Sequence, residues 1–91
     1  MNKMITQGQS AFMETYAQFP LVLTRGEGRY VYDTDNKRYL DMVAGIAVNI
    51  LGYGDPLLSE ALKAVVEDGL LHCSNFYWNP HAITAAEKLA Q

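Results

Sequence analysis

Hydrophobic and polar positions predict helices near the two ends of the chain and short strands between them. Residues 6–18 place apolar side chains on one side of a helix, and Phe19-Pro20 ends it because proline disfavours helical backbone angles in the residue before it. Residues 56–68 predict a second helix with apolar side chains along one side, which begins at Pro56 after Asp55. A third helix is predicted from Pro80 onward after Asn79, since a capping residue followed by a first-turn proline is typical of a helix start.

Three segments between these helices, residues 21–25, 29–33 and 38–42, have the composition and alternation of short strands. Turn-forming residues separate them, and Asn36 is the best candidate for a positive φ. Strands joined by such short turns pair as an antiparallel meander. The sequence therefore predicts an α+β fold in which a three-stranded antiparallel meander is flanked by helices.

The apolar residues of the run 41–56 follow neither the period of a helix nor the alternation of a strand. Small residues, branched apolar residues and one amide precede a Gly-x-Gly-Asp-Pro turn, and glycine there allows backbone angles and close approaches that a side chain would forbid. One interpretation is a wall that presents backbone groups to a ligand. The other is a buried strand followed by a tight turn, because short apolar runs usually belong to a core.

Composition and charge exclude several functions. The 91 residues carry a net charge of −3 without a basic cluster, so neither nucleic acid nor a membrane surface is expected as a partner. Cys73 cannot form an internal disulfide, and no segment is long and apolar enough to span a membrane. Local motifs predict no metal site and no catalytic group, since calcium-loop, zinc and phosphate-loop spacings are all absent.

Several short motifs in a fixed order indicate a protein family more specifically than composition does. They are Phe19-Pro20, Arg25-Gly26-Glu27-Gly28, Tyr32-Asp33, Tyr39-Leu40-Asp41, the run 41–56 and the stretch from His72 to Asn79. In these the chain, from about Tyr16 onward, resembles the N-terminal region of class III aminotransferases. These are pyridoxal-phosphate enzymes of fold type I whose chains are several times longer.

The resemblance implies a division of the chain. Residues 1–18 correspond to an N-terminal arm helix. Residues 19–91 correspond to the N-terminal part of the small domain, cut before the large α/β domain that binds the cofactor. Pyridoxal 5'-phosphate would therefore be held by residues outside this chain, and the 91 residues alone would be inactive.

The resemblance is greatest to members that act on N2-acetyl-L-ornithine. It implies transfer of the terminal amino group of that substrate, or of a similar ω-amino compound, to 2-oxoglutarate in arginine biosynthesis, by a cytoplasmic homodimer. Succinylated diamines, ornithine and other ω-amines stay open as donors. The alternative function is that of a truncated, non-catalytic fragment that acts only as an interaction module.

By resemblance, the substrate-contact candidates are Ile46 and Trp78, with Gly45, Ala47 and Asn79 beside them. Relatives that use ornithine carry a tyrosine where Ile46 stands, and an apolar residue there suits a substrate whose α-amine is acetylated. The alternative is that Ile46 and Trp78 are core residues, as branched and aromatic side chains usually are. No catalytic, cofactor-binding or metal-binding residue is assigned.

Two stretches depart from the family pattern. Relatives commonly show Gly-His-x-His-Pro where this chain has tyrosine and aspartate in place of the two histidines, at residues 52–56. They show paired tyrosines where this chain has Tyr77-Trp78. The second change enlarges an aromatic side chain at a cleft position, and this is why the amino donor stays open.

Overall fold

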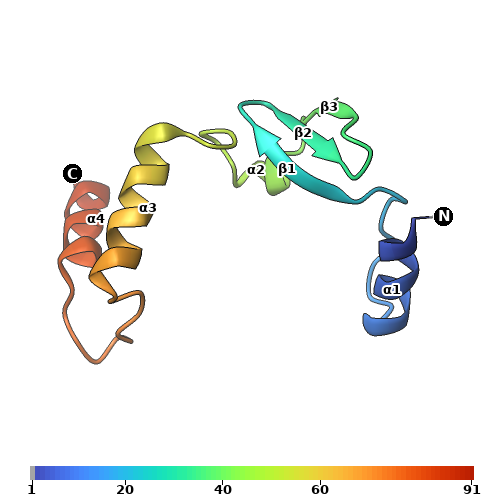
Figure 1. Cartoon of the computed structure of the whole chain (residues 1–91). Helices are drawn as coiled ribbons and strands as arrows, with labels where there is room; N and C mark the ends of the chain where they lie inside the picture. Colours follow the sequence, from blue (N-terminus) through green and yellow to red (C-terminus); the bar gives the residue numbers. More distant parts are fainter. Residues whose placement is uncertain (1) are drawn as a thin grey trace. The chain divides into compact units, whose positions relative to one another are not determined.

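A computed structural model describes residues 2–91 as two compact units, one ending at Pro56 and the other running from Leu57 to Gln91 (Figure 1). The first contains three strands and two helices, α1 (Lys3–Ala11), β1 (Leu23–Glu27), β2 (Tyr30–Asp33), β3 (Arg38–Leu40) and α2 (Ala44–Ala47). The second is built from α3 (Pro56–Asp68) and α4 (Pro80–Ala90).

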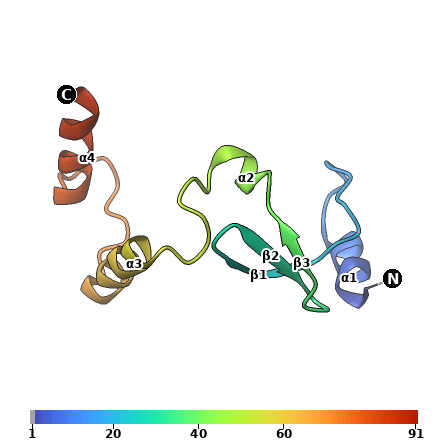
Figure 2. The same ribbon diagram turned by 90° about the horizontal axis from the view of Figure 1, so that it is seen from above.

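The three strands form one antiparallel sheet in the order β1-β2-β3, in which Val31 pairs with Gly26 on one side and Tyr39 on the other (Figure 2). The predicted meander and α+β class are thus confirmed. β1 lies two residues later than predicted, so that the first turn tightens to Gly28, at φ +60°, and Arg29. Asn36 has a φ of 62° in the second turn, as predicted.

The sheet holds the small core of the described residues. Val31 is its one buried apolar side chain, and Asp33 is buried beside it. The Asp33 carboxylate accepts hydrogen bonds of 2.9 Å each from the backbone N–H groups of Asp35 and Lys37 and from the Tyr39 hydroxyl. These bonds, led by that from Lys37, lower the pKa of Asp33 below its ordinary value. A carboxylate thus fixes the turn between β2 and β3.

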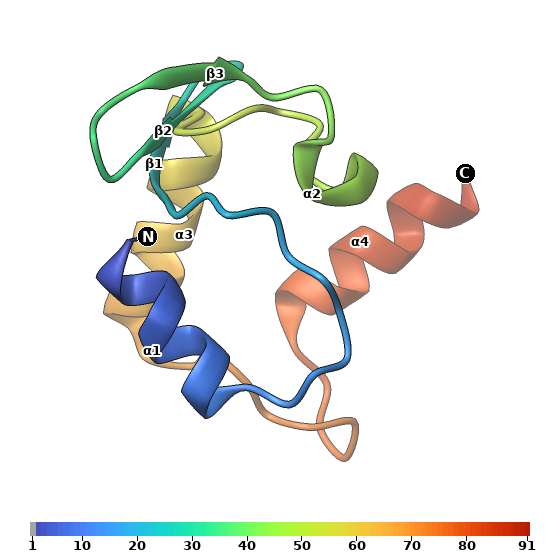
Figure 3. The same ribbon diagram turned by 90° about the vertical axis from the view of Figure 1, so that its right-hand side faces the viewer.

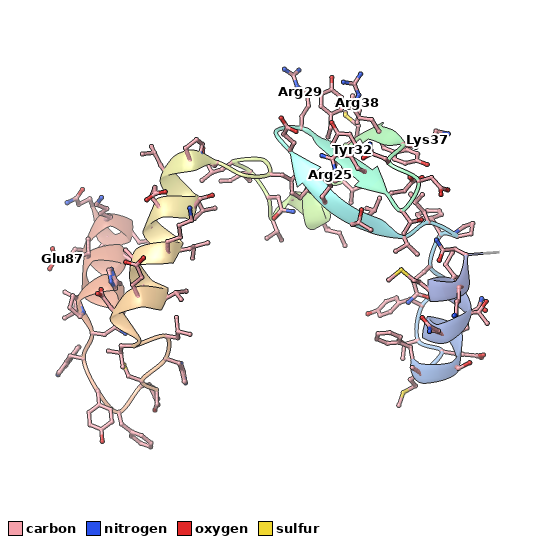
Figure 4. All side chains as sticks on the ribbon, in the orientation of Figure 1. Arg25, Arg29, Tyr32, Lys37, Arg38 and Glu87 are labelled. Atoms are coloured by element: carbon pink, nitrogen blue, oxygen red, sulfur yellow. The ribbon has the colours of Figure 1, made fainter. Side chains whose placement is uncertain are left out.

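Cationic side chains stack on tyrosine rings of the sheet. The Arg25 guanidinium lies 3.6 Å from the centroid of the Tyr32 ring (Figure 4). The Arg38 guanidinium lies 4.4 Å from the centroid of the Tyr30 ring. At exposed sites each such pair contributes about 0.5–1 kcal/mol. Stacking of this kind supports strands whose faces are otherwise open to water.

The first helix is shorter and starts earlier than predicted. Helix α1 spans Lys3–Ala11 instead of residues 6–18, because the Asn2 side chain caps it by accepting a 2.8 Å hydrogen bond from the Met4 N–H. The helix ends where Phe12 takes an extended conformation. The apolar residues expected on its second half therefore lie in an irregular segment that reaches as far as β1.

The second unit confirms both predicted helix starts. Helix α3 has the predicted bounds and stops at Gly69, whose φ is +86°. Helix α4 begins after Asn79, whose side chain accepts a 2.8 Å hydrogen bond from the Ala82 N–H. Figure 3 shows α3 and α4 diverging from the loop that joins them.

One expectation for the second unit is wrong. An apolar stripe such as that of residues 56–68 is expected to face a core, yet Leu58 is 44% exposed and Leu62 is 58% exposed. Among residues 2–91, only the sheet strands contact one another as elements, so no element covers α3. Its apolar stripe is therefore largely exposed within the part of the chain that the structure describes.

Candidate functional site

The run after β3 forms a left-handed turn. All residues of α2 (Ala44–Ala47) have positive φ values, 53°, 64°, 62° and 62° in chain order. Its hydrogen bonds are still helical in spacing, with the Ala47 N–H donating to the Val43 carbonyl oxygen at 3.0 Å. The expectation of a buried strand is therefore wrong, because this run turns back on itself and contains no buried residue.

This turn is strained. Ala44, Ile46 and Ala47 carry a Cβ atom, and an L-residue in left-handed conformation costs roughly 1–2 kcal/mol. Ile46 is the most unusual of them because a branched side chain rarely accepts a positive φ. Such a conformation persists only where the surrounding structure holds it.

Hydrogen bonds to Asp41 stabilise this strained turn. One oxygen of its carboxylate, Oδ1, accepts hydrogen bonds of 3.0 Å from the N–H groups of Val43 and Ala44, at the entrance to the turn. The other oxygen, Oδ2, accepts a hydrogen bond from the Tyr53 hydroxyl. Asn49 donates to the same hydroxyl at 3.3 Å, which leaves the hydroxyl proton directed at Asp41.

Tyr53 is in turn fixed to the sheet. Its backbone N–H and carbonyl exchange two hydrogen bonds of 2.8 Å with Gly28, next to the β1–β2 turn. Its ring covers Gly26 so closely that a Cβ atom at residue 26 would lie 2.5 Å from Cγ of the ring. The hydrogen-bonded chain Gly28–Tyr53–Asp41 thus connects the hairpin to the left-handed turn.

The same hydrogen bonds set the electrostatics of the site. Bonding from Tyr53, followed by bonding from the Ala44 and Val43 amides, lowers the pKa of Asp41 below its ordinary value of 3.8. The bond to Asp41 raises the pKa of Tyr53 above its ordinary value of 10.0. At neutral pH the pair is therefore a carboxylate and a neutral phenol, the protonation states that the hydrogen bond requires.

A shallow hollow of about 300 Å³ lies beside the turn. Its walls are Gly28, Arg29, Asp41, Ala44, Asn49, Ile50, Leu51, Gly52 and Tyr53. Ile46 is 84% exposed and is not part of that wall. The hollow thus belongs to the framework of the turn, whereas Ile46 extends from the turn into solvent.

The five residues predicted to contact substrate fall into two groups. Gly45, Ile46 and Ala47 lie together in α2, in the first unit. Trp78 and Asn79 precede α4, in the second unit. Trp78 is 90% exposed, so neither it nor Ile46 serves as core within the described residues.

Asn79 already has structural partners. Its Oδ1 caps α4, and its Nδ2 donates to the Cys73 sulfur at 3.6 Å. Its amide is therefore committed to the loop and to the helix start, whereas the Trp78 ring is open for contact.

Charged groups that could bind a cofactor are dispersed. Lys3, Lys63 and Lys88 lie on helices and Lys37 lies in a turn, with its ammonium 5.4 Å from the Tyr39 ring centroid. None of them lines the hollow beside α2. The described residues hold no group of three His, Cys, Asp or Glu side chains suited to a metal ion. No helix among them is long and apolar enough to cross a bilayer.

A comparison with protein families decides the relationship. Residues 11–91 match the model of aminotransferase class-III. The chain belongs to this family. Class III aminotransferases depend on pyridoxal phosphate. Of the cationic side chains, Arg29 lines the hollow beside α2 and the four lysines of this aminotransferase chain do not.

Curated relatives and solved structures agree with this family. An acetylornithine aminotransferase of Caldanaerobacter subterraneus is 47% identical over 88 residues, which are 97% of this chain and 22% of the relative. One from Aquifex aeolicus is 51% identical over 79 residues, 87% of this chain and 21% of the relative. The aminotransferase chain thus spans about a fifth of the length of these relatives.

Two solved structures extend the likeness to three dimensions. The acetylornithine aminotransferase of Elizabethkingia anophelis has a TM-score of 0.86 at 26% identity, over 96% of this chain and 22% of that one. The N-acetylornithine aminotransferase of Stenotrophomonas maltophilia has a TM-score of 0.71 at 35% identity, over 93% of this chain and 21% of that one. This chain therefore has the fold of the corresponding segment of an aminotransferase.

Sequence reasoning missed the residues that frame the turn. Asp41, Asn49 and Tyr53 had no assigned role, although an aspartate side chain commonly accepts a hydrogen bond from the backbone N–H group two residues further along the chain. Tyr53, the tyrosine that donates to Asp41 from twelve residues further on, has no comparable local sequence signal.

Proposed function

We propose that this chain is the N-terminal portion of an aminotransferase that moves the terminal amino group of N2-acetyl-L-ornithine, or a similar ω-amino substrate, to 2-oxoglutarate in arginine biosynthesis. The identity of 47% to an acetylornithine aminotransferase over 97% of the chain carries the proposal. The complete protein would act as a cytoplasmic homodimer. The division into an arm, residues 1–18, and part of the small domain, residues 19–91, belongs to the same proposal.

In this proposal the chain contributes part of the substrate cleft and none of the catalytic groups. Pyridoxal phosphate provides the electron sink for amino transfer when it is bound, and residues outside these 91 would hold it. Gly45, Ile46 and Ala47 would line one part of the cleft, and Trp78 and Asn79 another. The 91 residues alone would be inactive.

The exposed side chain of Ile46 supports a preference for acetylated substrates. It offers no hydrogen-bonding group and is available for contact, at 84% exposure. A free ammonium group buried against such a surface would lose water without gaining a partner, which is costly. An acetylated amine carries no charge and has an apolar methyl group that fits there.

Ile46→Tyr tests this role, because it adds a phenol where the unacetylated amine would lie. We expect the ratio of kcat/KM for ornithine to kcat/KM for acetylornithine to rise about tenfold in the full-length protein. Ile50→Tyr is the matched control, since Ile50 is also 84% exposed but lies outside α2. Equal losses for both substrates in Ile46→Tyr would instead indicate a packing role.

The intact mass of the purified protein, read with its absorbance, tests the proposal as a whole. We expect a mass above 10.2 kDa, the absorption band of a lysine-bound pyridoxal imine, and formation of glutamate from acetylornithine and 2-oxoglutarate. A mass of 10.2 kDa without that band would contradict the enzymatic proposal and support a non-catalytic interaction module.

A further inference from the structure

Two aspartate–tyrosine pairs in the first unit are built alike. In the first, Asp33 binds two backbone N–H groups of the following turn through Oδ1 and the Tyr39 hydroxyl through Oδ2. In the second, Asp41 does the same with two N–H groups through Oδ1 and the Tyr53 hydroxyl through Oδ2. We call them the Asp33–Tyr39 clamp and the Asp41–Tyr53 clamp.

The two clamps hold different structures. The Asp33–Tyr39 clamp closes a hairpin turn in which Asn36 alone has a positive φ. The Asp41–Tyr53 clamp lies at the entrance to four consecutive residues with positive φ, Ala44–Ala47, of which only one is glycine. The second clamp therefore holds the more strained backbone, and that backbone carries the exposed Ile46.

The Asp41–Tyr53 clamp also determines where the left-handed turn lies. The Tyr53 backbone pairs with Gly28, and its ring lies over Gly26, so the phenol has little freedom to move. With the phenol fixed, the hydrogen bond to Asp41 sets the position of the turn relative to the β1–β2 hairpin. Loss of the hydroxyl would break this connection and leave the ring in place.

We propose that Tyr53 is a positioning residue which, through Asp41, holds the left-handed turn and so fixes the direction in which Ile46 meets the substrate. The inference rests on the proposed function, in which Ile46 contacts the amino donor. It adds a selectivity role for a hydroxyl group that itself touches no substrate. Shape discrimination by one apolar contact is sensitive to displacements of this kind.

Tyr53→Phe tests the inference, and Tyr39→Phe is its matched control. Each change removes one hydroxyl group from one clamp and keeps the ring. In the full-length protein we expect Tyr53→Phe to reduce the preference for acetylornithine over ornithine about fivefold, through a higher KM for acetylornithine with kcat retained. Tyr39→Phe should leave that preference unchanged.

Hydrogen exchange provides a readout that does not depend on activity. The N–H groups of Val43 and Ala44 should exchange faster in Tyr53→Phe, and those of Asp35 and Lys37 should exchange faster in Tyr39→Phe. Unchanged exchange at Val43 and Ala44 in Tyr53→Phe would overturn the claim that the clamp holds the turn.

The remaining outcomes separate this inference from the proposed function. Faster exchange at Val43 and Ala44 with an unchanged substrate preference would overturn the selectivity role alone, and the proposed function would stand. A wild-type protein that transfers no amino group from either substrate would overturn the proposed function and the selectivity role together. In that case the exchange data alone would decide whether Tyr53 holds the turn.

Discussion

At the residue scale, the protein depends on a few carboxylates that bind more than one group each. Asp33 and Asp41 each accept three hydrogen bonds, two of them from backbone N–H groups. A carboxylate that receives several such bonds favours its charged form. Local backbone conformation is therefore linked to the protonation state of single side chains.

The first prediction at this scale is a pH dependence. The pKa of Asp41 is lowered, so its contribution to stability is fully present above 3.8 and is lost as pH falls through the lowered value. The pKa of Tyr53 is raised, so its contribution is present below 10.0 and is lost at more alkaline pH. The thermal midpoint of Tyr53→Phe should therefore differ most from that of the wild type near neutral pH.

The measurement is a series of thermal unfolding curves for both proteins from neutral pH downward through the lowered pKa of Asp41. We expect the difference between the two midpoints to shrink as Asp41 becomes protonated. A difference that stays constant over this range would show that the Tyr53 hydroxyl contributes without regard to the charge of Asp41.

Residue-scale features were only partly accessible from sequence. The positive φ of Asn36 was predicted because asparagine in a short turn favours that conformation. The positive φ of Ile46 could not be predicted, because local preference opposes it and a tyrosine seven residues further on supports it. The roles of Ile46 and Trp78 as substrate contacts stay predictions.

At the element scale, glycines show where packing controls the fold. Gly26 in β1 lies under the Tyr53 ring, whereas Gly8 in α1 has open space around it, since an added Cβ atom would meet only the Phe12 ring at 3.9 Å. The same residue type thus has opposite roles in the two elements. One makes room for a neighbour, and the other only weakens a helix.

Alanine at these two positions should change stability in opposite directions. Gly26→Ala should destabilise the full-length protein by about 1–3 kcal/mol, because the new Cβ atom would overlap the ring. Gly8→Ala should stabilise it by about 0.5–1 kcal/mol, because alanine favours a helix. Thermal midpoints of the two variants check both signs, and a Gly26→Ala protein as stable as wild type would rule out close packing of Tyr53.

The elements were the part of the structure best predicted from sequence. Helix α3 and the start of α4 were correct, because a capping residue and a first-turn proline are local signals. The bounds of α1 were wrong, because the Asn2 side chain caps the helix four residues before the predicted start at residue 6. The form of residues 41–56 was missed, because a left-handed turn has no hydrophobic period.

At the scale of the whole molecule, apolar surface exceeds what the chain can bury. Val31 is the one apolar core residue among residues 2–91, whereas side chains such as Phe12, Leu62 and Trp78 are 74%, 58% and 90% exposed. A chain that buries a single apolar side chain gains too little from burial to offset its conformational entropy. The relatives that this chain matches are about four times as long.

The 91 residues expressed alone should therefore behave as a loosely folded chain. We expect binding of a hydrophobic dye and a broad thermal transition without cooperativity, measured by fluorescence and circular dichroism. The full-length protein is the control and should show a sharp transition with little dye binding. A sharp transition in the isolated chain would mean that its sheet and helices are self-sufficient.

The left-handed turn has a consequence for chirality. At Ala44, Ile46 and Ala47 the backbone has the hand that mirror-image amino acids prefer. A D-alanine introduced by chemical synthesis would relieve strain there that every ribosomally made residue other than glycine must bear. Among encoded residues, only glycine, as at Gly45, takes this hand without that cost.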